Sequence, residues 1–359
     1  MPVSVSYLDA ITGRSDSGIG IRTVEWMRDN GARGLVDRVE NLYYSLTAPS
    51  RGGPGLKALP AQSGAVALRP SGQIPRSFVR AGPRIRYYRP PTIAPVIRPA
   101  LPGEGVWHPT FAAGGSHPPV LITSFRHEPA YPQLVAGVAW IDHTRTRVML
   151  YPGISEPSVT MRSRGPADVP VSARSGLVAT FNSAFKLRDS RGGFAYNGHT
   201  YAPMKRDTAT IVRYRDGRVA VISWHGGSDV SSNILYARQN LPLIVDGGRP
   251  NPNLSDGPQW GATLGKATMV WRSAVGVDRH GNLIYAAAND QTVSSLAAIM
   301  IRAGAVRAME LDINTYWTSF ITYRYPGAHH PANLLADMDR SPTRYLTPDD
   351  RDFFAVYVR

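Results

Sequence analysis

Two acidic residues stand two positions apart in the run Met309-Glu310-Leu311-Asp312-Ile313-Asn314. The run predicts a short strand that ends in the Asp312 carboxylate and the Asn314 amide, and strand alternation would place Glu310 and Asp312 on the same face. Two carboxylates on one face are costly unless they are solvated, paired or coordinating. The pattern therefore favours a functional site, with Asp312 as the first candidate for a catalytic carboxylate and Glu310 and Asn314 as substrate-binding candidates.

An arginine precedes small residues in the upstream run Trp271-Arg272-Ser273-Ala274-Val275-Gly276. One predicted strand–helix–strand unit separates it from Asp312, so the guanidinium and the carboxylate are expected to meet in space. Arg272 is therefore the candidate for a bidentate clamp on a phosphate group, with a surface salt bridge as the alternative. An acid beside a cation suits chemistry on an anionic, sugar-like substrate.

Polar and aromatic residues elsewhere supply further binding groups. Asn182 ends a predicted strand and offers its amide to a hydroxyl group, although it also fits a turn. Lys186 offers a point charge to a phosphate group. Trp317 offers a ring on which a sugar can stack. We therefore predict that these three residues bind substrate.

A second candidate for the catalytic carboxylate is Asp246, which follows the apolar residues 241–245. Gly247 and Gly248 come next, and a strand that ends in Asp-Gly-Gly can bring backbone N–H groups to an anion. Gly247 and Gly248 are therefore substrate-binding candidates. The same three residues also fit a tight turn.

The elements that must position these residues are short strands and tight turns, beginning near residue 120. Two hairpins are predicted, from residues 208–214 with 219–224 and from residues 273–277 with 283–287. Further strands are predicted at residues 134–141, 146–151, 177–181 and 308–313. Thr292 is the expected N-cap of a helix that stops at Gly304. This pattern predicts an α+β fold, with a mixed, hairpin-rich sheet and crossover helices, preceded by a helical and Pro-rich N-terminal region.

Three segments are predicted along the chain: an N-terminal helical segment at 1–47, a Pro-rich basic connector at 48–119 and the site-bearing domain at 120–359. Residues 21–46 favour two amphipathic helical pieces. The connector holds 14 prolines, and proline fixes φ and lacks an N–H donor. Extended structure is therefore expected there.

Composition bounds the class of protein. The 359 residues are 43% hydrophobic and 18% charged, which is typical of a globular protein with a sizeable core. No run of 18 apolar residues predicts a membrane span. The absence of cysteine excludes disulfides, zinc–thiolate sites and cysteine nucleophiles. No secretory signal is visible, yet a chain without cysteine fits an exported or cell-envelope protein.

The net charge of +14 is unevenly distributed. Residues 51–103 contain nine Lys or Arg residues and no Asp or Glu. Such a segment is expected to associate with an anionic membrane or wall surface, with a solvated linker as the alternative. Nucleic acid is the least supported partner, because no recognition motif accompanies the charge.

In chain order, these segments resemble the phosphodiester glycosidase family. The Asn-Gly-Gly-Phe-Phe-like segment of the family corresponds to residues 182–186, and its Arg-(Ser/Thr)-Ala-x-Gly segment to residues 272–276. Its Leu-Asp-Gly-Gly-Gly-Ser-like segment corresponds to residues 311–316. The resemblance covers roughly residues 120–325. Bulkier residues replace the glycines in the first and third segments, so the pocket is expected to differ in shape.

The resemblance implies a hydrolase that cleaves a sugar-1-phosphodiester between the anomeric carbon and the phosphate oxygen. Asp312, or Asp246, would stabilise the oxocarbenium-like centre or activate water. The resemblance further implies that Arg272 and Lys186 form an anion clamp. It also implies that the amides of Asn182 and Asn314 orient sugar hydroxyl groups. An extracellular or cell-envelope bacterial glycopolymer is the expected substrate. No cofactor is expected, and the need for a divalent cation stays open.

Two other functions fit the same residues. One is a non-catalytic envelope protein that binds a glycan, such as an anionic carbohydrate or a sugar-phosphate polymer. The other is a metal-assisted phosphodiesterase, with Asp246, Glu310 and Asp312 around a hard cation. Both alternatives predict an anionic ligand, so the residues alone do not separate them from the glycosidase.

Overall fold

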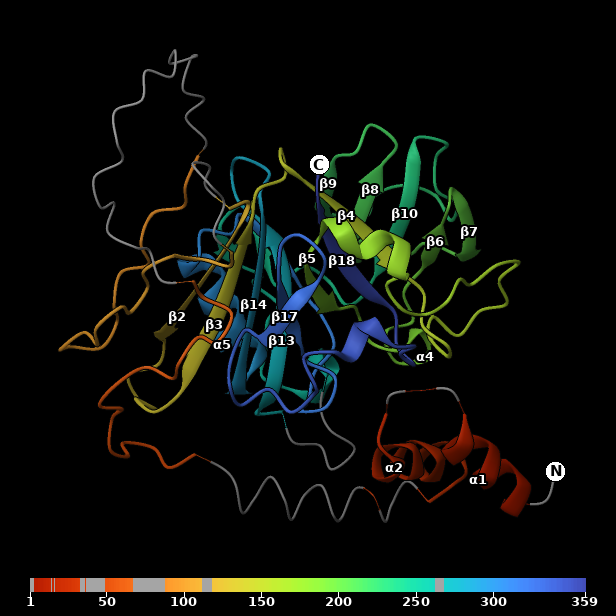
Figure 1. Ribbon diagram of the computed structural model, residues 1–359, viewed down its shortest axis with the longest axis horizontal. Helices are drawn as coiled ribbons and strands as arrows, with labels where there is room; N and C mark the ends of the chain where they lie inside the picture. The colour runs from red at the N-terminus through yellow and green to blue at the C-terminus, as the bar shows by residue number, and fades with distance from the viewer. Residues whose placement is uncertain are drawn as a thin grey trace.

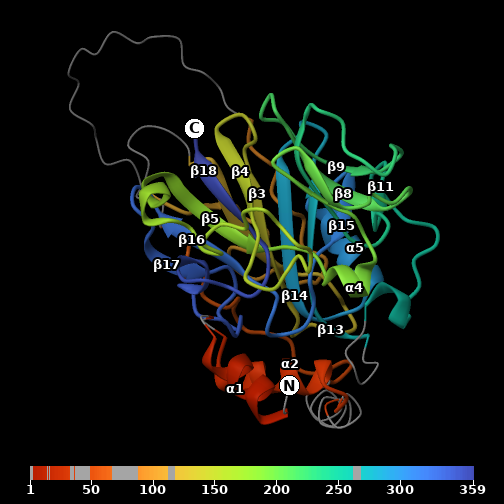
Figure 2. The ribbon, with the colours of Figure 1, turned by 90° about the vertical axis from the view of Figure 1, so that its right-hand side faces the viewer.

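Three antiparallel sheets make up most of the described structure (Figures 1 and 2). Every pairing between described strands is antiparallel. The computed structural model describes residues 3–13, 15, 17–32, 36, 49–66, 88–111, 118–261 and 268–359.

The largest sheet has eight strands in the order β1-β2-β3-β14-β13-β15-β11-β12. Its strands are β1 (His108–Pro109), β2 (Val120–Arg126), β3 (Val135–Ile141), β11 (Val245–Asp246), β12 (Arg249–Pro250), β13 (Val270–Val277), β14 (Leu283–Gln291) and β15 (Arg307–Glu310).

Two smaller sheets have five strands each, in the orders β7-β6-β10-β8-β9 and β17-β16-β5-β18-β4. The strands of the first are β6 (Phe194–Tyr196), β7 (His199–Ala202), β8 (Ala209–Tyr214), β9 (Val219–Ser223) and β10 (Ile234–Gln239). The strands of the second are β4 (Thr146–Tyr151), β5 (Leu177–Asn182), β16 (Phe320–Arg324), β17 (His329–Asn333) and β18 (Phe353–Val358).

Helices are short and few among the described residues. They are α1 (Val3–Thr12), α2 (Ile19–Asp29), α4 (Leu187–Ser190) and α5 (Val293–Arg302), with 3-10 turns at Val171–Gly176, Pro258–Trp260 and Arg344–Leu346. Strands β14 and β15 pair with opposite edges of β13, so they run parallel to each other and α5 is the crossover between them. The fold is thus mostly β, and the predicted α+β class is confirmed only in its hairpins and in this one described crossover helix.

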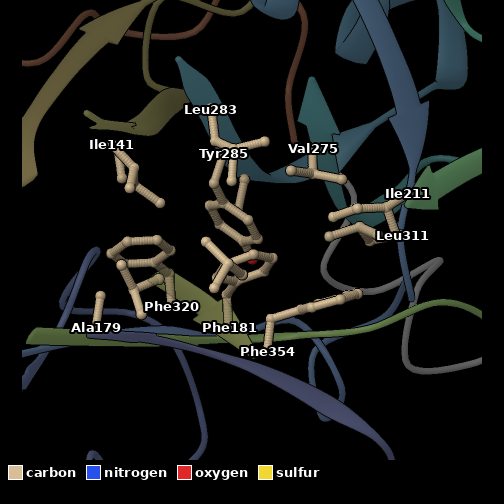
Figure 3. Packing of buried hydrophobic residues seen from close by; sticks show 14 of the residues in the cluster. Ile141, Ala179, Phe181, Ile211, Val275, Leu283, Tyr285, Leu311, Phe320 and Phe354 are labelled. Carbon is tan, nitrogen blue, oxygen red and sulfur yellow. The ribbon is translucent and has the colours of Figure 1, made fainter. Parts of the chain in front are cut away.

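Strand alternation explains how the largest sheet covers two cores. Along β14, Leu283 and Tyr285 enter the core shared with the smaller sheets, whereas Ile284 points to the core under α5. Figure 3 shows Leu283 and Tyr285 above Phe181 and Phe354, which come from a smaller sheet. Because side chains of a strand alternate between faces, an unbroken apolar run such as residues 283–288 suits a sheet that is buried on both sides.

Local signals gave the hairpins and the helix correctly. Strands β8 and β9 pair across Gly217, whose φ is 91°. Strands β13 and β14 pair as predicted. The Thr292 hydroxyl accepts from the Ser295 N–H at 3.3 Å at the start of α5, and Gly304 has a φ of 95° just after the helix. These features depend only on neighbouring residues, which is why the sequence predicts them.

The predicted strand at 308–313 is wrong at its end, because β15 stops at Glu310. The Asp312 N–H instead donates to the Ser183 carbonyl at 2.9 Å, and Asn314 has a φ of 70°. The chain therefore leaves the largest sheet and crosses to the end of β5. The prediction that Glu310 and Asp312 share a strand face is wrong for the same reason.

Helices α1 and α2 form an antiparallel pair beneath the sheets, in red in Figures 1 and 2. The Tyr7 and Trp26 rings meet at 5.0 Å, and the Trp26 indole donates to the Ser6 hydroxyl at 3.0 Å. We call α1, α2 and their connection the N-terminal hairpin. Its α2 confirms the first predicted helical piece, whereas the second, apart from Val36, lies outside the described residues.

Part of the connector packs on the largest sheet. Ile93 is buried in the core under α5, and β1 pairs with β2. Glu104 forms a buried salt bridge with Arg126 of β2 at 2.9 Å, and the Arg126 guanidinium also donates to the Pro99 carbonyl at 2.9 Å. The division into three segments stays a prediction. No described helix has the length and apolar character needed to cross a membrane.

Candidate active site

A cavity of about 570 Å³ lies between the N-terminal hairpin and the sheets. On the domain side it is lined by Lys186, Trp317 and Arg351, and on the hairpin side by Glu25, among other residues. The lining residues are mostly polar or charged: Ser6, Asp9, Ala10, Ser17, Ile21, Arg22, Glu25, Trp26, Asn30, Ser155, Glu156, Ser158, Lys186, Arg188, Trp317, Asp350 and Arg351. Such a lining suits a charged, hydrophilic ligand.

The pairing of β5 with β18 brings Lys186 and Arg351 to the same end of their sheet. Strands β5 and β18 are antiparallel neighbours, with Asn182 opposite Phe353. The chain that follows β5 therefore meets the chain that precedes β18, and the Ser183 N–H donates to the Asp352 carbonyl at 3.3 Å. Lys186 follows β5 and Arg351 precedes β18, so both reach the cavity.

The Arg351 guanidinium is held by neighbouring side chains, yet two of its nitrogens make no hydrogen bond among the described residues. It stacks over the Trp317 ring at 4.3 Å and lies 3.4 Å from Asp312, measured from Nη1 to Oδ2. Within the described residues, its buried Nε and Nη1 make no hydrogen bond. Burial lowers the pKa of Arg351, but the carboxylates of Asp312 and Glu25 outweigh it and raise the pKa. An anion in the cavity would satisfy these donors.

Asp312 pairs with Arg351 but does not itself line the cavity, and its side chain is only 9% exposed. Burial raises the pKa of Asp312 to about 6, against the opposing effects of Arg351, the Ile313 N–H and Lys186. The Ile313 N–H donates to Oδ1 at 3.0 Å. At neutral pH Asp312 is therefore mostly ionised, yet it holds a proton far more readily than an exposed aspartate.

Glu25 of α2 lines the cavity and pairs with one of its cations, Lys186. Its carboxylate accepts a hydrogen bond from the Lys186 ammonium. The hairpin is further anchored by Ser15 and Ser17, whose hydroxyls donate to the Asp350 carboxylate at 2.6 and 2.8 Å. The N-terminal hairpin thus covers the cations with a carboxylate of its own.

Asn182 lies beneath the site rather than in the cavity. Its amide nitrogen donates to the Ser273 hydroxyl at 2.9 Å, and its oxygen accepts from the Tyr285 hydroxyl at 2.9 Å and the Ser319 N–H at 3.0 Å. The Ser273 hydroxyl donates in turn to the Asp312 carbonyl at 2.8 Å. The Asn182 amide therefore fixes the backbone at Asp312 through Ser273, whereas the sequence predicted that it would bind a substrate hydroxyl group.

Arg272 points away from this cavity and pairs with Glu310, so the prediction that its guanidinium meets the Asp312 carboxylate is wrong. It alternates with Ser273 along β13 and faces the α5 side, where it pairs with Glu310. All five guanidinium N–H groups have acceptors, which are Glu310 and the carbonyls of Trp260, Gly261, Thr268 and Gln291. Arg272 therefore has no donor left for a phosphate group, and Glu310 is not available to a substrate.

We expect Arg272 to act on stability. Arg272→Gln should lower the free energy of unfolding by about 3–5 kcal/mol, because it leaves the buried Glu310 carboxylate without its partner. The matched control is Arg307→Gln, which breaks the exposed pair with Asp246 and should cost about 1 kcal/mol or less. Urea denaturation measures both. Equal losses in the two variants would contradict a structural role for the buried pair.

Asp246 is remote from the cavity. It is exposed and pairs with Arg307 at 3.2 Å, at the start of β15, whereas Asp312 follows the end of that strand. Gly247 and Gly248 have φ values of 59° and 74° and join β11 to β12. These are the angles of a two-residue hairpin turn. The alternative of a tight turn is thus confirmed, and the structure does not bring these three residues to the candidate site.

Of the remaining candidates, Trp317 lines the cavity but Asn314 does not. The Asn314 side chain accepts from the Tyr316 N–H at 3.1 Å and so closes a local turn. Arg351 was missed by the sequence analysis, although the charged run 349–352 immediately before an apolar strand is a visible signal. Glu25 lies on α2 and carries no comparable signal.

A hard cation would need carboxylates gathered in one place. Glu310 faces Arg272, Asp312 faces Arg351 and Asp246 is exposed at Arg307. The described residues contain no group of three or more side chains placed to hold a metal ion. The three carboxylates of the metal-assisted alternative are therefore separated in space.

Comparison with known proteins agrees with the motifs. Residues 171–312 match the family model described as phosphodiester glycosidase, which confirms the resemblance over a shorter range than expected. The chain is similar to the zebrafish N-acetylglucosamine-1-phosphodiester alpha-N-acetylglucosaminidase catalytic domain auto-inhibited by pro-peptide, with a TM-score of 0.44 and 14% identity over 70% of this chain and 88% of that one. It is also similar to a hypothetical protein from Synechocystis, with a TM-score of 0.40 and 14% identity over 67% and 62%. No curated protein matches the sequence.

Proposed function

We propose that this chain, whose residues 171–312 match the phosphodiester glycosidase family model, hydrolyses a sugar-1-phosphodiester between the anomeric carbon and the phosphate oxygen. The products are a free sugar and a phosphomonoester. We further propose an extracellular or cell-envelope glycopolymer as the substrate. The family match supports a hydrolase of this class, and the polymer is inferred from the charge of the chain.

The observation that carries the proposal is the pair of cations beside a buried carboxylate. Lys186 and Arg351 line the cavity, and Asp312 lies 3.4 Å from Arg351. Arg351 has buried donors without hydrogen-bond partners, and Lys186 holds the carboxylate of Glu25. A phosphodiester that replaces Glu25 would satisfy the same groups. Lys186 and Arg351 are therefore the proposed anion clamp, in place of Lys186 and Arg272.

Asp312 is the proposed catalytic carboxylate. Once the phosphodiester is held by the cations, the anomeric carbon next to it gains positive character as the bond to phosphate oxygen breaks. An ionised Asp312 stabilises that centre or removes a proton from the attacking water. Arg351 neutralises charge on the departing phosphate, so no strong general acid is needed at the leaving group.

Asn182 and Ser273, which lie beneath the site, hold the backbone at Asp312 in position. Asn182 holds the Ser273 hydroxyl, which donates to the Asp312 carbonyl. These bonds fix the segment that carries Asp312 against β5 and β13. Preorganised geometry of this kind lowers the barrier because the charged group needs no rearrangement during the reaction.

The products of a sugar 1-(p-nitrophenyl phosphate) distinguish the candidate functions. Cleavage at the anomeric carbon releases free sugar and colourless p-nitrophenyl phosphate, whereas attack at phosphorus releases p-nitrophenol and a sugar phosphate. We expect free sugar, at a rate that a chelator does not change. Reaction in ¹⁸O-labelled water should place the label in the sugar.

Each other outcome identifies an alternative. Release of p-nitrophenol that is lost on chelation would favour the metal-assisted phosphodiesterase. Saturable binding of the sugar phosphate without either product would favour a glycan-binding protein without catalysis. The assay should be run with several sugars, because the bulky segments 183–184 and 313–316 reshape the pocket relative to the family pattern.

We also propose that residues 51–103 associate with an anionic membrane or wall polymer and that the protein is exported or held in the cell envelope. The support is the uninterrupted positive charge of this segment. Described parts of it lie on the surface, with Arg51, Lys57 and Arg89 exposed. Such association would bring the candidate site close to a polyanionic substrate.

A further inference from the structure

A second cavity, of about 460 Å³, lies between the two smaller sheets. It is lined by Arg147 of β4, Arg213 of β8, Arg215, Asp216, Gly217, Val358 of β18 and Arg359. Four of these residues are arginines. We call this cavity the arginine cleft.

The arginine cleft carries unbalanced positive charge. Among the described residues, none of its four arginines has a carboxylate partner. Its single acidic residue, Asp216, bonds instead to Arg218 outside the lining, at 2.7 Å. Guanidinium groups gathered in this way repel one another unless an anion or solvent screens them. The cleft therefore has the charge of an anion-binding site.

Arg213 supplies a second observation. It is half-buried, and its Nε–H is enclosed without a hydrogen-bond acceptor among the described residues. Its guanidinium contacts the thioether sulfur of Met149, which is a weak acceptor. Burial lowers the pKa of Arg213, and the neighbouring Arg147 and Arg359 lower it further. A buried donor without an acceptor is costly, and an oxyanion would supply the missing acceptor.

Other contacts hold the remaining arginines in position. Arg359 donates to the Thr146 carbonyl at 2.9 Å, Arg215 donates to the Ser232 carbonyl at 2.7 Å, and Arg147 lies over the Tyr357 ring at 5.4 Å. Each of these contacts engages only part of a guanidinium group. The remaining donors are thus held near the cleft, as an anion site requires.

The arginine cleft is separate from the candidate active site. Arg351 precedes β18 and Arg359 follows it, and a strand rises about 3.3 Å per residue, so the two sites are on the order of 20 Å apart. Figures 1 and 2 show the C-terminus at the opposite end of the molecule from α1 and α2. An anion in the arginine cleft would not be the group that reacts at Asp312.

We propose that the arginine cleft is a binding site for a phosphate-type oxyanion, either free phosphate or a phosphodiester group of a polymer. Guanidinium groups suit this ligand because their planar donors match the oxygens of phosphate. The proposal does not depend on the proposed function, since it assigns no catalytic step to the cleft.

The test compares two double variants with the same change in net charge. Arg147→Gln/Arg215→Gln removes two exposed cleft arginines, and Arg249→Gln/Arg279→Gln removes two exposed arginines elsewhere. Isothermal titration uses inorganic phosphate and, separately, a short glycerol-phosphate oligomer. Each protein also carries Lys186→Gln/Arg351→Gln, which removes both cations of the proposed anion clamp at the candidate active site. Thermal unfolding first checks that all proteins are folded.

We expect saturable binding that weakens at least tenfold in the cleft variant and changes less than twofold in the control variant. The Nε–H signal of Arg213 in ¹⁵N-labelled protein should shift on saturation. Binding of the oligomer alone would identify a polymer as the ligand, and binding of inorganic phosphate alone would identify the free ion. Equal weakening in both variants, or no saturable binding of either probe, would overturn the proposal.

Discussion

Asp312→Asn is expected to reduce turnover by on the order of 100-fold or more while the protein stays folded. The substitution removes the charge at the reacting carbon but keeps an oxygen that can accept from the Ile313 N–H. Turnover of a sugar 1-phosphodiester measures the effect, and thermal unfolding checks the fold. Near-wild-type turnover by the folded variant would rule out Asp312 as the catalytic carboxylate.

The matched control is Asp246→Asn, which makes the same chemical change at the other carboxylate that the sequence singles out. Asp246 is exposed and pairs with Arg307 far from the cavity. We therefore expect less than a twofold change in turnover. A large loss in this variant with little loss in Asp312→Asn would move the site to the β11–β12 turn.

The same carboxyl group should set the pH dependence of the wild-type protein. Burial raises the pKa of Asp312 from 3.8 to about 6, so the group is protonated below that pH and ionised above it. Because the ionised form is the active one, kcat/KM should rise with pH through about 6 and then level off. A rate that falls as pH rises through this range would mean that the protonated form is needed.

The sequence predicts those parts of the fold that depend on neighbouring residues. The β8–β9 turn needs a residue with positive φ, which Gly217 provides, and α5 needs a cap, which Thr292 provides. The end of β15 could not be predicted in this way. There the Asp312 N–H bonds to Ser183, and only the assembled sheets bring these two residues together.

In the candidate site, too, some residues could be predicted from short sequence motifs, whereas others depend on pairing between strands that are distant in the sequence. Lys186 and Asp312 belong to recognisable motifs, but Arg351 joins them only because β5 pairs with β18. The sequence also places Arg272 and Ser273 side by side without indicating which of them faces the site. In the structure Ser273 faces Asp312, and Arg272 is bound to Glu310 on the opposite side of β13. A residue can thus belong to a family motif and still act as support for its neighbour.

The N-terminal hairpin should limit access to the candidate site. Glu25 holds Lys186, so a phosphodiester reaches that cation only after the hairpin moves. If the open state is a minor one, the apparent affinity for substrate is reduced by its population. Glu25→Gln removes the ion pair and should therefore raise kcat/KM on the order of tenfold, which corresponds to about 1.4 kcal/mol in favour of the open state.

Two further variants separate release of the hairpin from a change in charge. Ser17→Ala removes the bond to Asp350 at 2.8 Å and alters no charge, so a rise in kcat/KM would come from release alone. Asp229→Asn removes an exposed carboxylate elsewhere and should have no effect. Hydrogen exchange in α2 should quicken in the Glu25 and Ser17 variants but not in the Asp229 variant. If exchange quickens while kcat/KM stays constant, the hairpin opens without controlling access, and Glu25 does not compete with the substrate for Lys186.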